Sequence, residues 1–419
     1  MNKIDKERIW VFSPVNNIAF KADIKGELTE EQLIKAITHT VSHYEMLNQK
    51  VILDNQGIAY FCKAENPKLV IEPMNCDWKE LVSEQQKIPF AIDKGELIRF
   101  FYQYTKSGIL LMSIVHHIAG DGISFTYLLQ DIMKSLSGMQ IEYRKINIFD
   151  IESLPKESKL RFPMTWLLKT MNKKWRKSGK TFGFDDYINM YNKYWSRNET
   201  FIDTYYLENA DFENICKFSK LNSLTVNTLI TTALIRASDE LSDVGLAASF
   251  RENGNTSMGG YATGISIKYK YNKKKDFVWN GKKVQKLIYG KLNNPAKKYF
   301  LLQFMSNIEP TLIDAIYFNA CSDYNNKTAE SFSKMFGYNG NPKGISITNL
   351  TKLPIDAKYK EYELTDFVFV PPLVLNAKRI IGIATIGKKM ALSLHLNNDV
   401  KTDEHREFFY KGMDYLKNL

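Results

Sequence analysis

Residues 109–122 read ILLMSIVHHIAGDG, and the rest of the chain is best understood from this stretch. Residues 109–115 are almost wholly apolar, which is typical of a strand buried on both faces. The strand ends at two histidines, His116 and His117, and neighbouring residues of an extended chain point to opposite faces. One imidazole can therefore face a cavity while the other packs inside, so we expect the two histidines to have different roles.

The residues after the histidines predict a sharp turn into a helix. Gly120 and Gly122 stand where a side chain would obstruct backbone or substrate, and the apolar residues of 123–136 recur at helical spacing. Taken alone, these residues leave four interpretations open: core histidines with Asp121 as a helix cap, a metal site on His117 and Asp121, a Ser-His-Asp hydrolase, or a histidine acting as general base. No third metal ligand lies nearby in the sequence and no Gly-x-Ser-x-Gly segment occurs, which disfavours the second and third.

The composition is that of a large globular protein. The 419 residues are 44% apolar, 25% charged and 13% aromatic, and this length suits two lobes of roughly 200 residues each. No run approaches the roughly 20 apolar residues that span a bilayer, and residues 1–10 lack the apolar core of a secretory signal. The four cysteines show no metal-binding or redox spacing. We therefore expect a cytoplasmic protein without a metal site.

The net charge of +11 is concentrated in three basic segments, 173–177, 273–275 and 282–283. Such segments are commonly solvated loops, but they would also attract an anionic partner: a nucleotide-bearing cosubstrate, an acidic carrier protein or a membrane surface. No zinc-finger, RRM or helix-turn-helix pattern accompanies the charge, so nucleic acid is not an expected partner. The basic and aromatic residues 166–184 predict a helix that either packs between the lobes or lies at a membrane interface.

Strands and helices alternate in both halves of the chain, which predicts an α/β protein of two lobes. We place the first lobe at residues 1–160, a connection at 161–198 and the second lobe at 199–419. The expected strands are 17–24, 49–53, 58–62, 97–104, 108–115, 201–207, 246–250, 262–270, 344–348, 366–370, 380–386 and 391–396. The expected helices are 29–46, 123–136, 210–221, 225–238 and 403–416.

Residues 116–122 match the His-His-x-x-x-Asp-Gly motif of the chloramphenicol acetyltransferase-like superfamily. This superfamily includes nonribosomal peptide condensation domains, plant acyl-CoA-dependent acyltransferases, wax ester synthases and alcohol acetyltransferases. The resemblance extends over nearly the whole chain, through residues 26–47, 90–97 and 224–237. It implies two chloramphenicol acetyltransferase-like lobes, each a mixed sheet with helices, and an active site in the tunnel between them.

By this resemblance, His117 is the base that takes a proton from an acceptor hydroxyl or amine as that group attacks a thioester carbonyl, without a covalent acyl-enzyme. His116 supports it, Asp121 makes a buried ion pair with an arginine, and Gly122, which we count as substrate-binding, leaves room beside the base. The implied cosubstrate is an acyl-CoA or a phosphopantetheine thioester on a carrier protein, and no cofactor is bound permanently. The basic segments are then expected to flank the donor entrance.

Residues 345–350 resemble the Ser-Asn-Leu-Gly region of many members, with a clean match at Asn349 and Leu350. The resemblance therefore adds Ser346, Thr348 and Asn349 to the expected substrate-binding residues.

The sequence departs from the family pattern at two places. Asn48 follows Leu47 where many condensation domains carry an arginine, so we take Arg251 as the partner of Asp121. Residues 336–338 keep only part of the Asp-Phe-Gly-Trp-type segment of the plant enzymes and of many condensation domains. These departures favour a stand-alone acyltransferase near the bacterial alcohol acetyltransferases. A free-standing condensation enzyme and a catalytically inactive recruiting domain of the same fold remain as alternatives.

Overall fold

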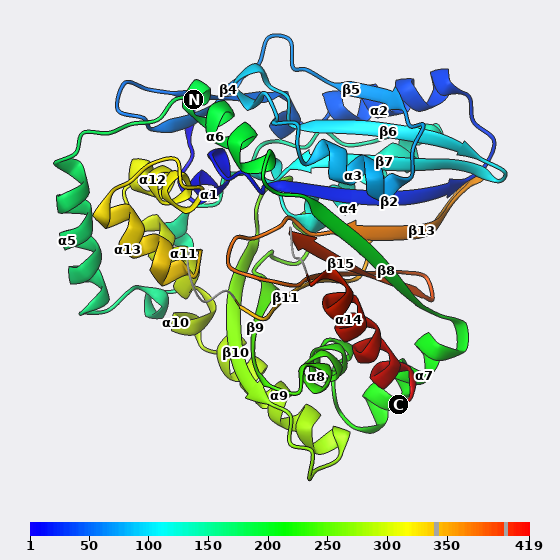
Figure 1. The fold of residues 1–419 in the computed structure, drawn as a ribbon. Helices are drawn as coiled ribbons and strands as arrows, with labels where there is room; N and C mark the ends of the chain where they lie inside the picture. The colour runs from blue at the N-terminus through cyan, green and yellow to red at the C-terminus, as the bar shows by residue number, and fades with distance from the viewer. Residues whose placement is uncertain (339–342, 398–400) are drawn as a thin grey trace.

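Two six-stranded mixed sheets form the framework of the protein, one above the other in Figure 1. The computed structural model describes residues 1–338, 343–397 and 401–419. In order across the first sheet, the strands are β12 (Lys358–Tyr359), β13 (Tyr362–Val370), β2 (Asn17–Lys25), β7 (Gly108–His116), β6 (Ile98–Thr105) and β5 (Val70–Pro73). Across the second sheet they are β10 (Ala262–Lys270), β9 (Leu241–Ser249), β11 (Ile345–Lys352), β14 (Ile380–Ile386), β15 (Lys389–Asn397) and β8 (Thr200–Glu208). This α/β arrangement confirms the predicted fold class.

Helices and one small sheet complete the described structure. The small sheet has the strand order β1 (Asn2–Lys3), β4 (Ala59–Lys63) and β3 (Gln49–Leu53). The α-helices are α1 (Arg8–Val11), α2 (Glu30–Ser42), α3 (Trp78–Gln85), α4 (Gly122–Leu136), α5 (Met164–Arg176), α6 (Phe184–Trp195), α7 (Asn209–Leu221), α8 (Val226–Ser238), α9 (Phe277–Leu292), α10 (Pro295–Lys298), α11 (Phe300–Ser306), α12 (Pro310–Ala320), α13 (Lys327–Phe336) and α14 (Thr402–Lys417). The short 3₁₀ turns are η1 (Glu45–Asn48), η2 (Ile92–Lys94), η3 (His117–Ala119), η4 (Ile151–Ser153) and η5 (Lys156–Ser158).

The last third of the chain returns to the first sheet. Strand β13 pairs antiparallel with β2, with Phe369 opposite Phe20, and β2 in turn pairs with β7, with Asn17 opposite His116. A strand that follows residue 360 is therefore two places away from the strand that carries the histidines. The boundaries at residues 160 and 198 stay a prediction, and the first sheet holds strands from both sides of them.

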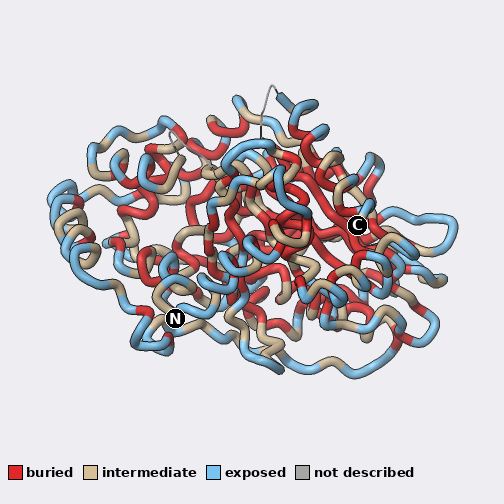
Figure 2. Tube along the Cα trace, turned by 90° about the horizontal axis from the view of Figure 1, so that it is seen from below, coloured by how far each residue is buried: buried red, intermediate tan, exposed pale blue. Residues whose placement is uncertain are grey.

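Apolar side chains fill the space around both sheets, and Figure 2 shows the buried residues running through the middle of the molecule. On the outer face of the second sheet, α8 and α14 lie against each other and bury residues such as Leu234, Phe409 and Met413. The opposite face of that sheet joins the core of the first sheet, because Ile380 and Ala384 belong to the same buried cluster as Phe20 and Phe369. The motif thus lies against a core that both sheets share.

Helix α2 is shorter than the predicted helix 29–46. It begins as expected at Thr29, whose side chain accepts a hydrogen bond from the Gln32 N–H in a capping box. It ends at Ser42 because the next residues pair elsewhere: the N–H of Arg144 donates to the His43 carbonyl and the N–H of Glu45 donates to the Arg144 carbonyl. The chain then makes the separate turn η1.

Two other expectations differ from the structure. The helix predicted within residues 166–184 is α5, which lies at the left edge in Figure 1 rather than between the sheets. Its Trp175 indole donates to Thr311 Oγ1 at 2.9 Å, so α12 holds it there. In addition, no helix was expected in residues 277–336, where five occur. Helix α12 is buried nearly all round, so its sequence lacks the one-sided apolar stripe on which a helix prediction depends.

Among the described residues, no helix has both the length and the apolar content needed to cross a bilayer.

The N-terminal helix α1 is fastened to α12 by a buried ion pair. Arg8 Nε donates to Asp314 Oδ1 at 2.9 Å, and its Nη2 also contacts the carboxylate. The exposed fractions of the two side chains are 0% and 1%, so water screens neither charge. The pair spans 306 residues of sequence and fixes the position of Trp10, which the site depends on.

We predict that Arg8→Met lowers the free energy of unfolding by about 3–5 kcal/mol, because it leaves the Asp314 carboxylate buried without a counter-ion. Urea unfolding measures this change. The double variant Arg8→Met/Asp314→Leu should be more stable than the single variant, since it removes both charges. As a control, Lys3→Met at the exposed Lys3–Asp5 pair should cost less than about 1 kcal/mol. Wild-type stability of Arg8→Met would contradict the prediction.

Candidate active site

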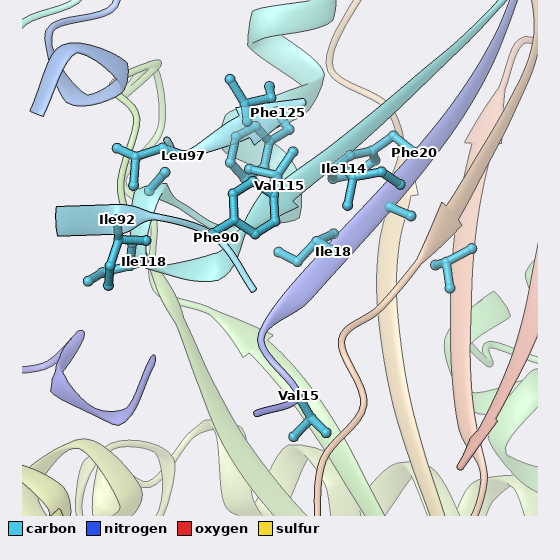
Figure 3. Close-up of a cluster of buried hydrophobic side chains, with 14 of the residues drawn as sticks. Val15, Ile18, Phe20, Phe90, Ile92, Leu97, Ile114, Val115, Ile118 and Phe125 are labelled. Atoms are coloured by element: carbon cyan, nitrogen blue, oxygen red, sulfur yellow. The ribbon is translucent and has the colours of Figure 1, made fainter. Parts of the chain in front are cut away.

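His116 is the last residue of β7 and lies inside the core. It is 1% exposed, and its Nδ1 accepts a hydrogen bond from the Ile118 N–H at 3.2 Å. Its Nε2 lies 2.7 Å from the side-chain amide of Asn16. Figure 3 shows the apolar side chains of this region, with Phe90, Val115 and Ile118 among them. Every polar atom of the His116 ring therefore has a neighbour within the protein, as suits a packing residue.

His117 begins the 3₁₀ turn η3 and has different surroundings. Its ring is stacked on the indole of Trp10, with ring centroids 3.9 Å apart and ring planes 10° from parallel. The backbone N–H of His117 donates to the Asn16 carbonyl at 2.9 Å, which fixes the main chain beneath the ring. Among the described residues, Nδ1 is buried without a hydrogen-bond partner. The residue as a whole is only half-buried, so part of it stays accessible.

Burial keeps both imidazoles uncharged at neutral pH. It lowers the pKa of His116 to about 3, because an imidazolium there would lose its hydration. Burial is also the main cause that lowers the pKa of His117 to about 4, although the Asp121 carboxylate acts in the opposite direction. A neutral imidazole has a free lone pair, so His117 is chemically able to accept a proton at pH 7.

Asp121 and Arg251 form a buried ion pair at the N-terminus of α4. Arg251 Nη2 donates to Asp121 Oδ1 at 2.9 Å, and the exposed fractions of the two side chains are 7% and 8%. The same oxygen accepts the N–H of Ser124 as the cap of α4, and Oδ2 accepts the N–H of Tyr261 at 2.9 Å. The predicted partner of Asp121 is therefore the residue that contacts it, and the carboxylate turns away from the histidines toward the second half of the chain.

A folded loop surrounds the guanidinium of Arg251. Its Nη1 donates to the carbonyls of Asn255 at 3.2 Å and Ser257 at 2.7 Å, and its plane lies over the Tyr261 ring at 4.2 Å. Such a planar, multiply bonded arginine holds a loop more rigidly than a lysine would. The motif loop after His117 is thereby attached to residues 251–261.

The two glycines of the motif are sites of close approach. A Cβ built on Gly122 would lie 2.6 Å from Leu350 Cδ2, and one on Gly120 would lie 2.9 Å from Ser124 Cβ. Neither distance leaves room for a side chain. Gly122 therefore lets Leu350, from the end of β11, pack against the start of α4.

The three residues expected on β11 have two kinds of environment. Ser346 and Thr348 are half-buried and lie opposite Ile380 and Gly382 of β14, on the sheet face that joins the shared core. Asn349 instead donates from Nδ2 to Asn227 Oδ1 at 3.1 Å and connects β11 to α8. The strand thus reaches the motif through Leu350, while the substrate-binding role of Ser346, Thr348 and Asn349 stays a prediction.

The departures from the family pattern have visible consequences. Asn48 donates from its side-chain amide to the carbonyls of Val41 and Tyr44, at 3.1 and 2.9 Å, and so caps the end of α2 instead of approaching Asp121. Residues 336–338 end α13, with Gly337 in the left-handed conformation at φ 78°.

The three basic segments do not form one surface. Residues 173–177 belong to α5 at one edge of the molecule, whereas 273–275 and 282–283 lie before and within α9 at the bottom of Figure 1. They cannot all flank one entrance, so that expectation was wrong as stated. Within residues 1–338, 343–397 and 401–419, no group of three or more His, Cys, Asp or Glu side chains could hold a metal ion.

Sequence reasoning missed Trp10 and Asn16 as parts of the site. Trp10 follows Arg8 in a charged N-terminal segment whose pattern marks no site. Asn16 precedes β2, and its contacts with both histidines follow from the pairing of β2 with β7. A signal for Asn16 existed in principle, because two paired strands place their ends together. No sequence rule would have identified the stacked indole.

Comparison with known proteins gives a consistent result. Residues 7–144 match the model of the condensation domain family. A plipastatin synthase polypeptide of Bacillus subtilis (strain 168) is 26% identical over 169 residues, which are 36% of this chain and 6% of that protein. The chain therefore spans a small fraction of the length of this relative.

Solved structures resemble the whole chain. The condensation domain from the Monacolin K polyketide synthase MokA has a TM-score of 0.65 at 12% identity, covering 100% of this chain and 96% of that one. Polyketide synthase associated protein 5 from Mycobacterium tuberculosis has a TM-score of 0.61 at 11% identity, with 100% and 97% covered. A mutant starter condensation domain of rhizomide synthetase RzmA, in complex with C8-CoA and Leu-SNAC, has a TM-score of 0.59 at 11% identity, with 98% and 91% covered. At these identities the likeness shows the fold.

For Asp121→Ala we predict a loss of about 3–5 kcal/mol in the free energy of unfolding, because the change leaves Arg251 buried without its counter-ion. Asp121→Asn should lose less, since the amide oxygen can still cap α4. The control Glu330→Ala removes one side of the exposed Glu330–Lys334 pair and should cost below about 1 kcal/mol. Chemical denaturation measures all three. An Asp121→Ala protein as stable as the control variant would show that the ion pair does not hold the loop.

The buried histidines also predict how stability changes with acid. An unfolded histidine has a pKa of about 6.5, and the folded pKa of His116 and His117 is lower. Their contribution to stability is therefore complete above about pH 6.5 and is lost as pH falls from there toward about 4 and then 3. We expect urea unfolding between pH 7.5 and 4.5 to show a smaller pH dependence in His116→Gln than in the wild type. Equal pH dependence in the two proteins would rule out a buried neutral His116.

Proposed function

Because this chain belongs to the chloramphenicol acetyltransferase-like superfamily, we propose that it transfers an acyl group from a thioester to a hydroxyl or amine acceptor, with His117 as general base. The donor is an acyl-CoA or an acyl chain on the phosphopantetheine of a carrier protein, and the acceptor is a small molecule. We place the reaction in the cytoplasm, where its free thiol product would stay reduced.

The proposed reaction proceeds in two steps. His117 takes the proton of the acceptor O–H or N–H while the acceptor oxygen or nitrogen attacks the thioester carbonyl carbon, giving a tetrahedral intermediate. The carbon–sulfur bond then breaks, the carbonyl reforms, and the thiolate leaves with the proton held by the imidazolium. The products are an ester or amide and a free thiol, and no acyl-enzyme is formed. Because Nδ1 is buried, we assign the proton transfer to Nε2.

The observation that carries the proposal is the neutral, stacked imidazole of His117. Its pKa of about 4 leaves the lone pair free at pH 7, and the Trp10 indole holds the ring plane. A base of such low pKa is weak in the ligand-free protein. Negative charge that develops on the thioester oxygen would favour the imidazolium beside it, so the pKa should rise as the intermediate forms.

The remaining motif residues have positioning roles in this proposal. Asp121 and Arg251 hold the loop, and His116 packs behind it. Gly122 keeps the start of α4 free of a side chain next to Leu350. We assign substrate contacts to Gly122, Ser346, Thr348 and Asn349, of which Ser346 and Thr348 face the shared core. The passage by which donor and acceptor reach His117 is proposed to run between the two sheets.

A free-standing condensation enzyme that joins two carrier-bound groups is the second candidate function. The match of residues 7–144 to the condensation domain family favours it. Supplying the same acyl group once on CoA and once on a carrier protein separates the two candidates, because the second should require carriers for donor and acceptor.

We predict that His117→Ala remains folded and loses about 10²- to 10⁴-fold in single-turnover acyl transfer, the usual contribution of a general base. His116→Ala should keep more activity than His117→Ala, because its ring packs behind the loop and contacts no reacting atom. Product mass spectrometry with mixed acyl-CoAs, alcohols and amines first identifies the substrates, and thermal melting checks the fold of each variant.

The outcome that would contradict the assignment is near wild-type turnover in a well-folded His117→Ala protein. That result would favour the inactive recruiting domain or a different base. If instead the melting temperature fell in His117→Ala and not in Asp121→Ala, the structural and catalytic roles would have to be exchanged.

A further inference from the structure

The exposed Phe and Trp side chains of this protein occur in one region. Within the described residues, Phe162, Trp166 and Phe300 are the exposed members of these two residue types, at 77%, 60% and 43%. Leu301, next to Phe300, is 39% exposed. Phe and Trp rings are normally buried, so several exposed rings together indicate a surface that contacts something else.

The two segments that carry these side chains lie beside each other. Gln303 of α11 donates to Ser158 Oγ of η5 at 3.1 Å, and α10 also contacts η5. Phe162 and Trp166 follow η5 by a few residues, and Phe300 starts α11 directly after α10. Figure 1 shows α5 along the edge of the molecule, next to α10, α11 and α13. We call the side chains of Phe162, Trp166, Phe300 and Leu301 the aromatic edge.

Helix α5 has one face toward the protein and one toward solvent. Leu168 and Trp175 are buried, and Asn172 donates to the Asn307 carbonyl at 2.8 Å. Trp166, Lys169 and Lys173 recur at spacings of three and four residues and are exposed, so they share the outer face. In Figure 2 the outer turns of α5 form the exposed left edge. The outer face thus runs from the aromatic edge to a row of lysines.

The charge of this region is almost entirely positive. Residues 156–180 contain nine Lys and Arg against one acidic residue, Glu157, and α10 adds Lys297 and Lys298. Two of these cations are paired, Lys159 with Glu152 and Arg176 with Glu309. Lys169, Lys173 and Lys174 form no ion pair with a described residue. The surplus charge is therefore available to an anionic partner.

We propose that the aromatic edge and the lysines of α5 form a binding surface for an anionic phospholipid bilayer. Trp and Phe side chains enter the headgroup region, and the lysines contact lipid phosphates. The rings project from the starts of two helices, which suits a bilayer because lipids accept single side chains without a matching pocket. The proposal does not depend on acyl transfer, so either can fail alone.

Cosedimentation of the full chain with vesicles tests the surface. We expect binding to vesicles of phosphatidylcholine with phosphatidylglycerol, weak binding to phosphatidylcholine alone, and weakening by added salt. Lys173→Glu/Lys174→Glu should bind about tenfold or more weakly. Lys282→Glu/Lys283→Glu on α9 changes the net charge equally and should bind as the wild type does. Phe162→Ser/Trp166→Ser should also lose binding, with an unchanged melting temperature.

Brominated lipids give a second measurement. They should quench the fluorescence of the wild type, and quenching should fall in Trp166→Phe. Equal loss of binding in the α5 and α9 charge variants would overturn the proposal, because net charge alone would then explain the attraction. Absence of binding to the anionic vesicles at low salt would overturn it as well, and binding of an acidic carrier protein in place of lipid would assign the surface to that partner.

Discussion

The shape of the catalytic loop depends on the contact between Asp121 and the segment that contains Arg251 and Tyr261. Asp121 accepts from Arg251 and from the Tyr261 N–H, while its own N–H donates to the Gly259 carbonyl. The loop therefore has little stability of its own, since residues far along the chain complete it. Leu350 against Gly122 and β13 beside β2 extend the same dependence, so both halves of the chain must fold before His117 is in place.

Burial and its electrostatic cost explain how the two adjacent histidines differ. His116 has neighbours for both ring nitrogens and is fully enclosed, whereas His117 has a stacked indole, one buried nitrogen and partial exposure. An imidazole that is held by stacking and not by a carboxylate remains neutral, which is the state that a proton acceptor needs. The protein uses its aromatic residues in two ways: Trp10 orders the site from inside, and Trp166 faces solvent at the edge.

Much of the framework could be predicted from the sequence, because β7, α4 and most strands of the second sheet have clear apolar patterns. The motif indicated different roles for His116 and His117, and the missing arginine after Leu47 directed attention to Arg251. Long-range placement could not be predicted. The Arg8–Asp314 pair, the Trp10 stack and the return of β13 to the first sheet join residues whose local sequence is ordinary. Helices such as α12, buried nearly all round, lack the periodicity that would reveal them.

The central claim is that His117 is a fixed, neutral imidazole poised to accept a proton. An NMR titration of its ring, assigned by comparison with His117→Gln, tests this claim without any knowledge of the substrate. The account predicts that His117 stays neutral down to about pH 4, the value to which burial lowers its pKa. Titration near the ordinary histidine value of about 6.5 would contradict it, because the ring would then be hydrated and not held beneath Trp10.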